Sequence, residues 1–169
     1  MKNFILLLTL ITSTFSYTQN LQIETNKTAV DFTYYSKSTK GTLQNVNAEI
    51  NINFKDLSQS VISGVADVST LSTNNKSRDN HLMSSDFFEV EKHPKMKFSS
   101  SKIYMENELY FVKGMLTIRG IEHEVIFTMN IDEALVTLAT DIYALDYGVA
   151  IKKDREHSRV GVLISLKLN

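Results

Sequence analysis

Val46-Asn-Ala-Glu-Ile-Asn-Ile-Asn-Phe54 alternates apolar and polar side chains along its whole length. Successive side chains of a β-strand point to opposite faces of the sheet, so this pattern predicts a strand with one apolar and one polar face. Residues 160–168 repeat the pattern with valine, isoleucine and leucine. No charged residue falls on the apolar face of either segment, and we expect both apolar faces to border one core.

The same alternation recurs along most of the chain beyond residue 20. Further strands are predicted over 30–34, 61–69, 96–98, 109–111, 116–118, 123–131 and 135–144. No segment sustains an apolar helical period. About eight strands joined by short turns indicate an all-β antiparallel domain. Both a sandwich and an eight-stranded barrel accept such strands, and alternation alone does not choose between them.

Composition narrows the class of protein. The chain has 169 residues, of which 43% are hydrophobic and 22% charged, a balance typical of one globular domain. Its net charge of −1 lacks the basic excess of nucleic-acid-binding proteins, so no nucleic-acid partner is expected. The absence of cysteine excludes disulfides, thiolate metal sites and cysteine nucleophiles.

The first residues have the three-part pattern of a secretory signal peptide. Lys2 supplies a positive charge, residues 4–11 form an apolar run, and small and polar residues follow up to Thr18. The apolar run is far shorter than the roughly 20 residues that span a bilayer as a helix. We therefore expect residues 1–18 to be a signal peptide, residues 19–169 to form the mature domain, and the protein to be exported, periplasmic or secreted.

Residues 72–94 interrupt the alternation. The segment is too long for a hairpin loop, which indicates a structured crossover between strands. Asp79 is expected to cap a helical turn through residues 81–83, and Asp86 to cap another that begins at Phe87.

This crossover carries a family signature. Arg78-Asp-Asn-His-Leu-Met-Ser-Ser-Asp-Phe-Phe-Glu-Val-Glu-Lys-His-Pro-Lys-Met-Lys-Phe-Ser-Ser100 resembles the hallmark stretch of the YceI-like, polyisoprenoid-binding family, and Gly114-Met-Leu-Thr-Ile-Arg-Gly120 resembles a second family block. The resemblance covers roughly residues 21–168. It implies an eight-stranded antiparallel, lipocalin-like β-barrel with a short helical crossover around residues 72–94. It also implies a bound isoprenoid-type lipid or other long-chain amphiphile in the bore.

One block departs from the family pattern. In Ile142-Tyr-Ala-Leu-Asp-Tyr-Gly148, Ala144 stands where the family usually carries a basic residue. This substitution removes a polar contact expected near one end of the pocket, so the resemblance does not identify the lipid head group.

The candidate ligand-binding side chains are inward-facing apolar residues, because an apolar bore suits a hydrocarbon chain. Two more come from the crossover, whose aromatic pair is expected to close one end of the bore. The set is Phe32, Ile50, Ile52, Phe54, Phe87, Phe88, Phe98, Phe111, Ile118, Phe127 and Ile164. Arg78 and Asp79 are expected to fix the crossover in place by a charge-assisted hydrogen bond.

No catalytic constellation accompanies these residues. The four histidines show no metal-ligand spacing, and the sequence contains neither a nucleophile elbow nor a glycine-rich phosphate loop. We therefore predict a non-enzymatic binding protein with no catalytic residues, no metal and no cofactor other than a bound lipid.

Three further expectations concern membrane insertion, an alternative function and dimerisation. The absence of tryptophan and the shortness of many strands argue against a membrane-inserted barrel. The alternative function is an exported scaffold or adhesion module with a filled core and no small ligand. An extended edge strand would also allow a homodimer.

Overall fold

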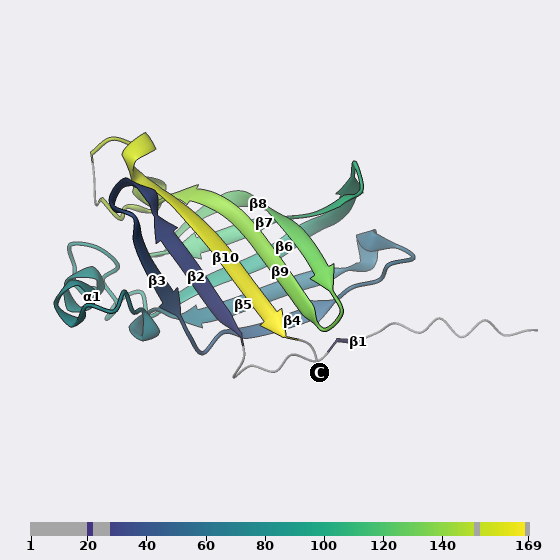
Figure 1. Ribbon diagram of the computed structural model, residues 1–169, viewed down its shortest axis with the longest axis horizontal. Helices are drawn as coiled ribbons and strands as arrows, with labels where there is room; N and C mark the ends of the chain where they lie inside the picture. Colours follow the sequence, from purple (N-terminus) through teal and green to yellow (C-terminus); the bar gives the residue numbers. More distant parts are fainter. Residues whose placement is uncertain (1–19, 22–27, 151–152, 168–169) are drawn as a thin grey trace, which may run out of the picture.

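The alternating segments form antiparallel strands of one strongly curled sheet (Figure 1). A computed structural model describes residues 20–21, 28–150 and 153–167. The predicted signal peptide, residues 1–18, lies outside the described residues. The all-β antiparallel fold with a short helical crossover is confirmed.

The described residues form the following strands and helices, given in chain order. The strands are β1 (Asn20–Leu21), β2 (Ala29–Tyr34), β3 (Thr39–Leu43), β4 (Asn47–Asn51), β5 (Val61–Asp67), β6 (Lys95–Glu106), β7 (Leu109–Ile118), β8 (Ile121–Asp132), β9 (Leu135–Tyr143) and β10 (Arg159–Lys167). The α-helix is α1 (Lys76–Met83), and the short 3-10 helices are η2 (Tyr35–Lys37), η3 (Leu57–Gln59), η4 (Val68–Thr70), η5 (Ala144–Tyr147) and η6 (Glu156–Ser158).

The strand count differs from the predicted eight. The described residues hold ten strands, of which β1 and β3 have no counterpart in the alternation pattern. The two pieces predicted at 109–111 and 116–118 are one continuous strand, β7. β3 escaped prediction because its sequence, Thr-Lys-Gly-Thr-Leu, does not alternate apolar and polar residues.

The sheet runs in the order β1-β4-β5-β6-β7-β8-β9-β10-β2-β3, and every neighbouring pair is antiparallel. The chain that follows β5 binds the β3 edge. The Thr42 N–H donates to the Ser72 carbonyl at 2.8 Å, and the Ser72 N–H donates to the Thr42 carbonyl at 2.9 Å. Thr70 bonds both backbone groups of Gln44 through its hydroxyl. These contacts connect the last strand of the sheet to the segment after β5.

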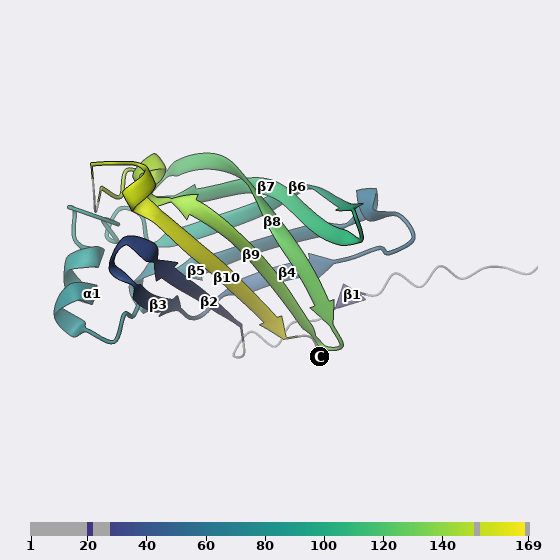
Figure 2. The same cartoon turned by 45° about the horizontal axis from the view of Figure 1, so that its top comes forward.

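The crossover lies at one end of the curled sheet, where α1 stands beside the chain ends of several strands (Figure 2). α1 begins earlier than the sequence predicts, because the Asn75 side chain accepts from the Arg78 N–H at 3.0 Å and caps the helix. The predicted cap at Asp79 is therefore wrong. Asp86 does not cap a helix either, because the chain around Phe87 forms a turn, closed by a hydrogen bond from the Phe87 N–H to the Ser84 carbonyl.

The core has two parts. From the cavity toward the end of the barrel away from α1, buried side chains pack directly on one another: Ile50, Ile52, Ile62, Phe98, Ile103, Val112, Phe127, Met129, Val136, Leu138 and Leu166. At the α1 end, two smaller clusters line opposite walls, one around Tyr147 and the other around Leu43. The bore is thus filled at one end and bordered by separate walls at the other.

Candidate functional site

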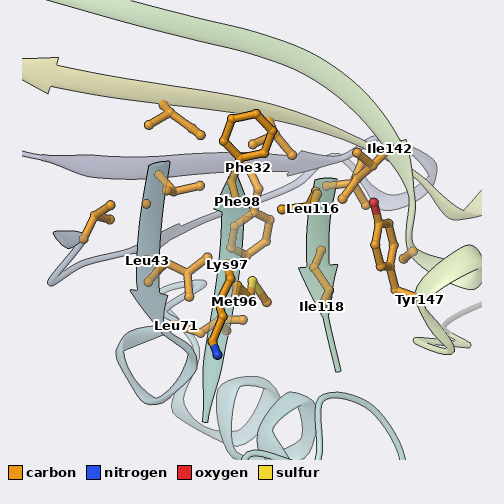
Figure 3. Close-up of a pocket in the computed structure, with 18 of the residues that line it drawn as sticks. Phe32, Leu43, Leu71, Met96, Lys97, Phe98, Leu116, Ile118, Ile142 and Tyr147 are labelled. Atoms are coloured by element: carbon orange, nitrogen blue, oxygen red, sulfur yellow. The ribbon is translucent and has the colours of Figure 1, made fainter. Parts of the chain in front are cut away.

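A cavity of about 260 Å³ occupies the bore at the α1 end (Figure 3). All the strands from β2 to β10 contribute to its walls, and α1 with the crossover contributes Leu82 and Phe88. Most of the lining is valine, leucine, isoleucine, alanine and phenylalanine. Such a lining repels water and favours an apolar ligand.

Strand parity explains how the walls are built. On β2, Val30, Phe32 and Tyr34 point to the bore, and on β10 the same holds for Val162 and Ile164. These two strands pair directly, with Phe32 opposite Val162 and Val30 opposite Ile164. The alternating apolar residues of the sequence thus form one continuous apolar wall across β2 and β10.

Gly64 on β5 keeps the bore open. A Cβ atom placed on Gly64 would lie 3.7 Å from the nearest heavy atoms, the Ala48 Cβ and the Asn47 carbonyl oxygen. That separation is an ordinary van der Waals contact, so the space above Gly64 is not taken by other side chains. The absence of a side chain here leaves room for a ligand.

Six of the eleven predicted ligand-binding residues line this cavity: Phe32, Phe88, Phe98, Ile118, Phe127 and Ile164. For the five that lie on strands, alternation in the sequence predicted which face they share, whereas Phe88 was expected from the crossover. Their contact with a ligand stays a prediction.

The other five lie outside the cavity lining. Ile50 and Ile52 are 3% and 1% exposed within the packed far end, where no space remains. Phe54 lies beyond the end of β4, is 51% exposed, and packs edge-on against Tyr110 with ring centroids 6.2 Å apart.

Phe111 and Phe87 lie outside the lining for different reasons. Because β7 is continuous, Phe111 has the opposite parity to Leu116 and Ile118 and stacks on Tyr104 instead, with centroids 5.4 Å apart. Phe87 packs against the Tyr147 cluster and places its ring edge-on to His81, at 4.8 Å, so it supports the crossover while Phe88 lines the cavity.

The crossover is fixed to the cavity wall through Thr73, which is 5% exposed. The Asp79 carboxylate accepts from both the N–H of Thr73, at 2.8 Å, and its hydroxyl. Arg78 donates to the Thr73 hydroxyl at 2.7 Å and to its carbonyl oxygen at 2.9 Å. Arg78 and Asp79 thus make the expected charge-assisted hydrogen bonds, with Thr73 as their shared partner, and their role in holding the crossover stays a prediction.

Ala144 begins η5 and is buried in the cavity lining. Its methyl group stands where the family usually carries a basic side chain, so this part of the wall is apolar. Beside it, the His123 ring packs edge-on against Tyr147 at 5.1 Å and its Nε2 lies 3.0 Å from the Asp146 carbonyl oxygen. His123 is therefore a packed rim residue with a backbone partner.

Two polar atoms in the lining were missed in the set of candidate residues. The hydroxyl oxygens of Tyr34 and Tyr147 are buried and have no hydrogen-bond partner within the described part of the chain. Burial, with a smaller contribution from Asp146, raises the pKa of Tyr147 to about 12. The parity of β2 already places Tyr34 beside Phe32, so this residue was readable from the sequence. Tyr147 was not, because it lies in η5, outside any alternating pattern.

Within the described residues, side chains that could bind a metal do not cluster. Among residues 20–21, 28–150 and 153–167, no group of three or more histidine, aspartate or glutamate side chains could hold a metal ion. A search of the same residues finds no helix with the length and apolar character needed to cross a membrane.

Comparison with known proteins identifies the family of this chain. The YceI-like domain family matches residues 21–169. The chain belongs to the YceI-like family. Among curated relatives, a UPF0312 protein of Photorhabdus laumondii is 31% identical over 91 residues, which cover 54% of this chain and 47% of that protein. A UPF0312 protein of Staphylococcus epidermidis is 36% identical over 91 residues, 54% of this chain and 51% of that protein. The matched segment thus spans about half the length of these relatives.

Solved structures share the YceI-like fold. Burkholderia cenocepacia BcnA superposes with a TM-score of 0.75 at 19% identity, covering 86% of this chain and 98% of that one. A Campylobacter jejuni YceI protein gives a TM-score of 0.64 at 20% identity, covering 100% and 99%. A polyisoprenoid-binding domain from Saccharophagus degradans, implicated in plant cell wall breakdown, gives 0.61 at 11% identity, covering 90% and 99%. At these identities the likeness establishes the fold alone.

Proposed function

We propose that this YceI-like chain binds an isoprenoid-type lipid with its hydrocarbon tail in the cavity and acts as a binding protein rather than an enzyme. The observation that carries the proposal is the apolar cavity of about 260 Å³ above Gly64, in a barrel whose other end is tightly packed. A scaffold with a filled core has no use for such a space. The polyisoprenoid-binding neighbour of the same fold supports the ligand class.

The cavity size suits a narrow chain. Small-molecule pockets commonly measure about 300–1,000 Å³, so this cavity lies near the lower end of that range. Burial of each methylene contributes about 0.8 kcal/mol, so about ten buried carbons contribute roughly 8 kcal/mol before the cost of ordering the ligand. Hydrophobic burial alone therefore gives useful affinity without catalysis or a metal.

The test is native mass spectrometry of the purified protein, before and after incubation with geranylgeraniol as the probe. We expect a one-to-one adduct whose mass corresponds to the added lipid. A protein that stays at its apo mass at every lipid concentration would contradict the proposal and favour the scaffold function.

A matched pair of variants tests the cavity itself. Gly64→Phe places an aromatic ring in the bore. Because such a ring buries about 150–250 Å² of surface, it should take the place of the lipid chain and abolish the adduct. Val61→Phe is the control, since Val61 lies on the same strand, is 46% exposed, and does not line the cavity. Equal lipid uptake by both folded variants would locate the ligand elsewhere.

Export is a separate proposal, carried by the N-terminal sequence pattern. We propose that residues 1–18 are removed during export, so that the chain meets its lipid outside the cytoplasm. The intact mass of protein from the periplasmic or secreted fraction tests this directly, with Gln19 expected as the first residue. Recovery of the full-length mass from the cytoplasm would contradict it.

A further inference from the structure

Two tyrosines line a mostly apolar cavity, and their buried hydroxyl groups have no partner within the described residues. Tyr34 is 5% exposed and Tyr147 is 2% exposed, and neither hydroxyl meets a hydrogen-bonding atom of the described residues. Buried polar groups are nearly always paired in folded proteins, because a buried donor without an acceptor is unfavourable. Two such groups in the lining of one cavity therefore indicate an external acceptor.

The two tyrosines lie at the same end of the bore. Val160, at the start of β10, pairs with Tyr34 on one side and with Ile142 on the other. Val160 and Ile142 also pack in the cluster that contains Tyr147. Figure 3 shows Tyr147 beside Ile142, with its hydroxyl oxygen directed toward that apolar side chain. Both hydroxyls are thus near the crossover end, and the packed far end carries neither.

The chemistry of the pair favours a neutral acceptor. A phenol hydroxyl donates one hydrogen bond, with a usual oxygen–oxygen distance of about 2.7–2.8 Å. Burial raises the pKa of Tyr147 to about 12, so this hydroxyl keeps its proton at neutral pH. A charged oxygen placed among Ile142, Val160 and Ala144 would lose its hydration without a buried cation to compensate.

The cations of the lining do not change this conclusion. Lys37, Lys97 and Arg78 border the cavity but are exposed to solvent. Arg78 already donates to Thr73. Exposed charges interact weakly with an anion because water and salt screen them.

We propose that Tyr34 and Tyr147 donate hydrogen bonds to a neutral carbonyl oxygen, of a ketone, ester or amide, in the ligand's head group. The tail then extends along the bore toward Phe127 and Leu138, where the cavity meets the packed core. This inference rests on the proposed lipid-binding function and specifies which end of the ligand lies where.

The test compares three probes of similar chain length: geranylgeranylacetone, which carries a ketone; geranylgeranyl phosphate, which carries an anion; and the hydrocarbon phytane. Apparent dissociation constants are measured by native mass spectrometry for the unmodified protein, Tyr34→Phe, Tyr147→Phe and the double variant. Tyr35→Phe is the matched control, because the neighbouring Tyr35 hydroxyl donates to Asp141 at 3.0 Å on the outer surface.

We expect the unmodified protein to bind the ketone more tightly than either other probe. Each single variant should weaken ketone binding about threefold to tenfold, the usual worth of one hydrogen bond, while phytane binding stays unchanged. The Tyr35→Phe control should bind all three probes normally. Thermal unfolding of the ligand-free variants should show no loss of stability, because neither hydroxyl has an internal partner to lose.

Three results would overturn the inference. These are equal weakening of ketone and phytane, no weakening of either, or tighter binding of the phosphate than of the ketone. If the unmodified protein binds none of the probes, the proposed function itself fails. If it binds ketone and phytane equally and the variants have no effect, lipid binding stands and the head-group assignment alone is withdrawn.

Discussion

The Arg119 guanidinium donates to the Gly148 carbonyl oxygen at 2.6 Å and so joins the turn between β7 and β8 to the loop after η5. The same side chain donates to the Ser85 carbonyl at 3.1 Å and reaches the Glu89 carboxylate at 3.5 Å. Hydrogen bonds from Lys92 and, to a smaller extent, from Arg119 hold the pKa of Glu89 below its usual range. One arginine thus connects three segments around the crossover end of the cavity.

Replacement of Arg119 by alanine should loosen the crossover. The Ser85 and Gly148 carbonyls would lose a charged donor, which costs about 1–3 kcal/mol of unfolding free energy. Hydrogen exchange over residues 84–93 should speed up, and bound lipid should be released faster. Hydrogen–deuterium exchange by mass spectrometry measures the first effect, and transfer of lipid to vesicles measures the second.

Arg159→Ala is the control for Arg119→Ala. Arg159 pairs with Asp141 at 2.5 Å on the outer surface, away from the crossover. This variant should leave exchange over residues 84–93 unchanged. Equal acceleration in both variants would mean that Arg119 acts through global stability and not as a local contact.

The Asp79 carboxylate should matter more for stability than the neighbouring Asp86. Asp79→Ala removes the acceptor of the buried Thr73 N–H and hydroxyl, so we expect a loss of about 1–3 kcal/mol. Asp86→Ala should cost little, because its carboxylate is exposed and lies 3.5 Å from an equally exposed His81. Urea unfolding of the two variants gives the comparison. Equal losses would show that Thr73 finds another acceptor.

The sequence predicted the strands better than it predicted which side chains reach the cavity. Phe32, Phe127 and Ile164 were placed correctly, because alternation within one strand fixes which residues share a face. Phe111 was misplaced because β7 was predicted as two separate strands. Alternation shows which residues share a face within one strand, but it does not relate the faces of two separate strands. Ile52 has the right parity but lies where the bore is filled, and no local pattern reports how far along a barrel the packing closes.

Some of the hydrogen bonds that hold the crossover could not be predicted from the sequence. The hydrogen bonds of Thr73 with Arg78 and Asp79 bridge only a few residues, and the sequence suggested the last two but not their partner. The approach of Arg119 to Gly148 and Ser85 depends on three separate loops meeting in space. Such contacts follow from the way the sheet curls and not from any local period.

Alanine substitutions at two strand glycines, Gly114 on β7 and Gly64 on β5, should change the stability in opposite directions. A Cβ on Gly114 would overlap the Ser99 carbonyl oxygen and the Phe98 ring, so Gly114→Ala should cost about 1–3 kcal/mol through strain. A Cβ on Gly64 has room, and strand interiors disfavour glycine, so Gly64→Ala should be neutral or stabilising by up to about 1 kcal/mol. Thermal unfolding distinguishes the two. Similar destabilisation by both variants would mean that the bore at Gly64 is closed.

The ion pair beside the cavity rim should give stability that depends on acidity. Arg155 donates to both carboxylate oxygens of Asp146, at 2.8 and 2.7 Å, and these hydrogen bonds hold the pKa of Asp146 below its usual value. An aspartate whose folded pKa is depressed stabilises the fold above the unfolded pKa of about 3.9, and this contribution is lost as the pH falls through the folded value.

Asp146→Asn should therefore destabilise the protein at pH 7 and have a diminishing effect as the pH falls below about 4. The effect at neutral pH should be modest and salt-sensitive, because the Arg155 side chain is 52% exposed. A double-mutant cycle with Arg155→Ala, measured by urea unfolding across pH, isolates the pair. The coupling should be present at pH 7 and absent well below pH 4. A coupling that stays constant across this range would show that the two side chains interact by packing and not through the charge of the carboxylate.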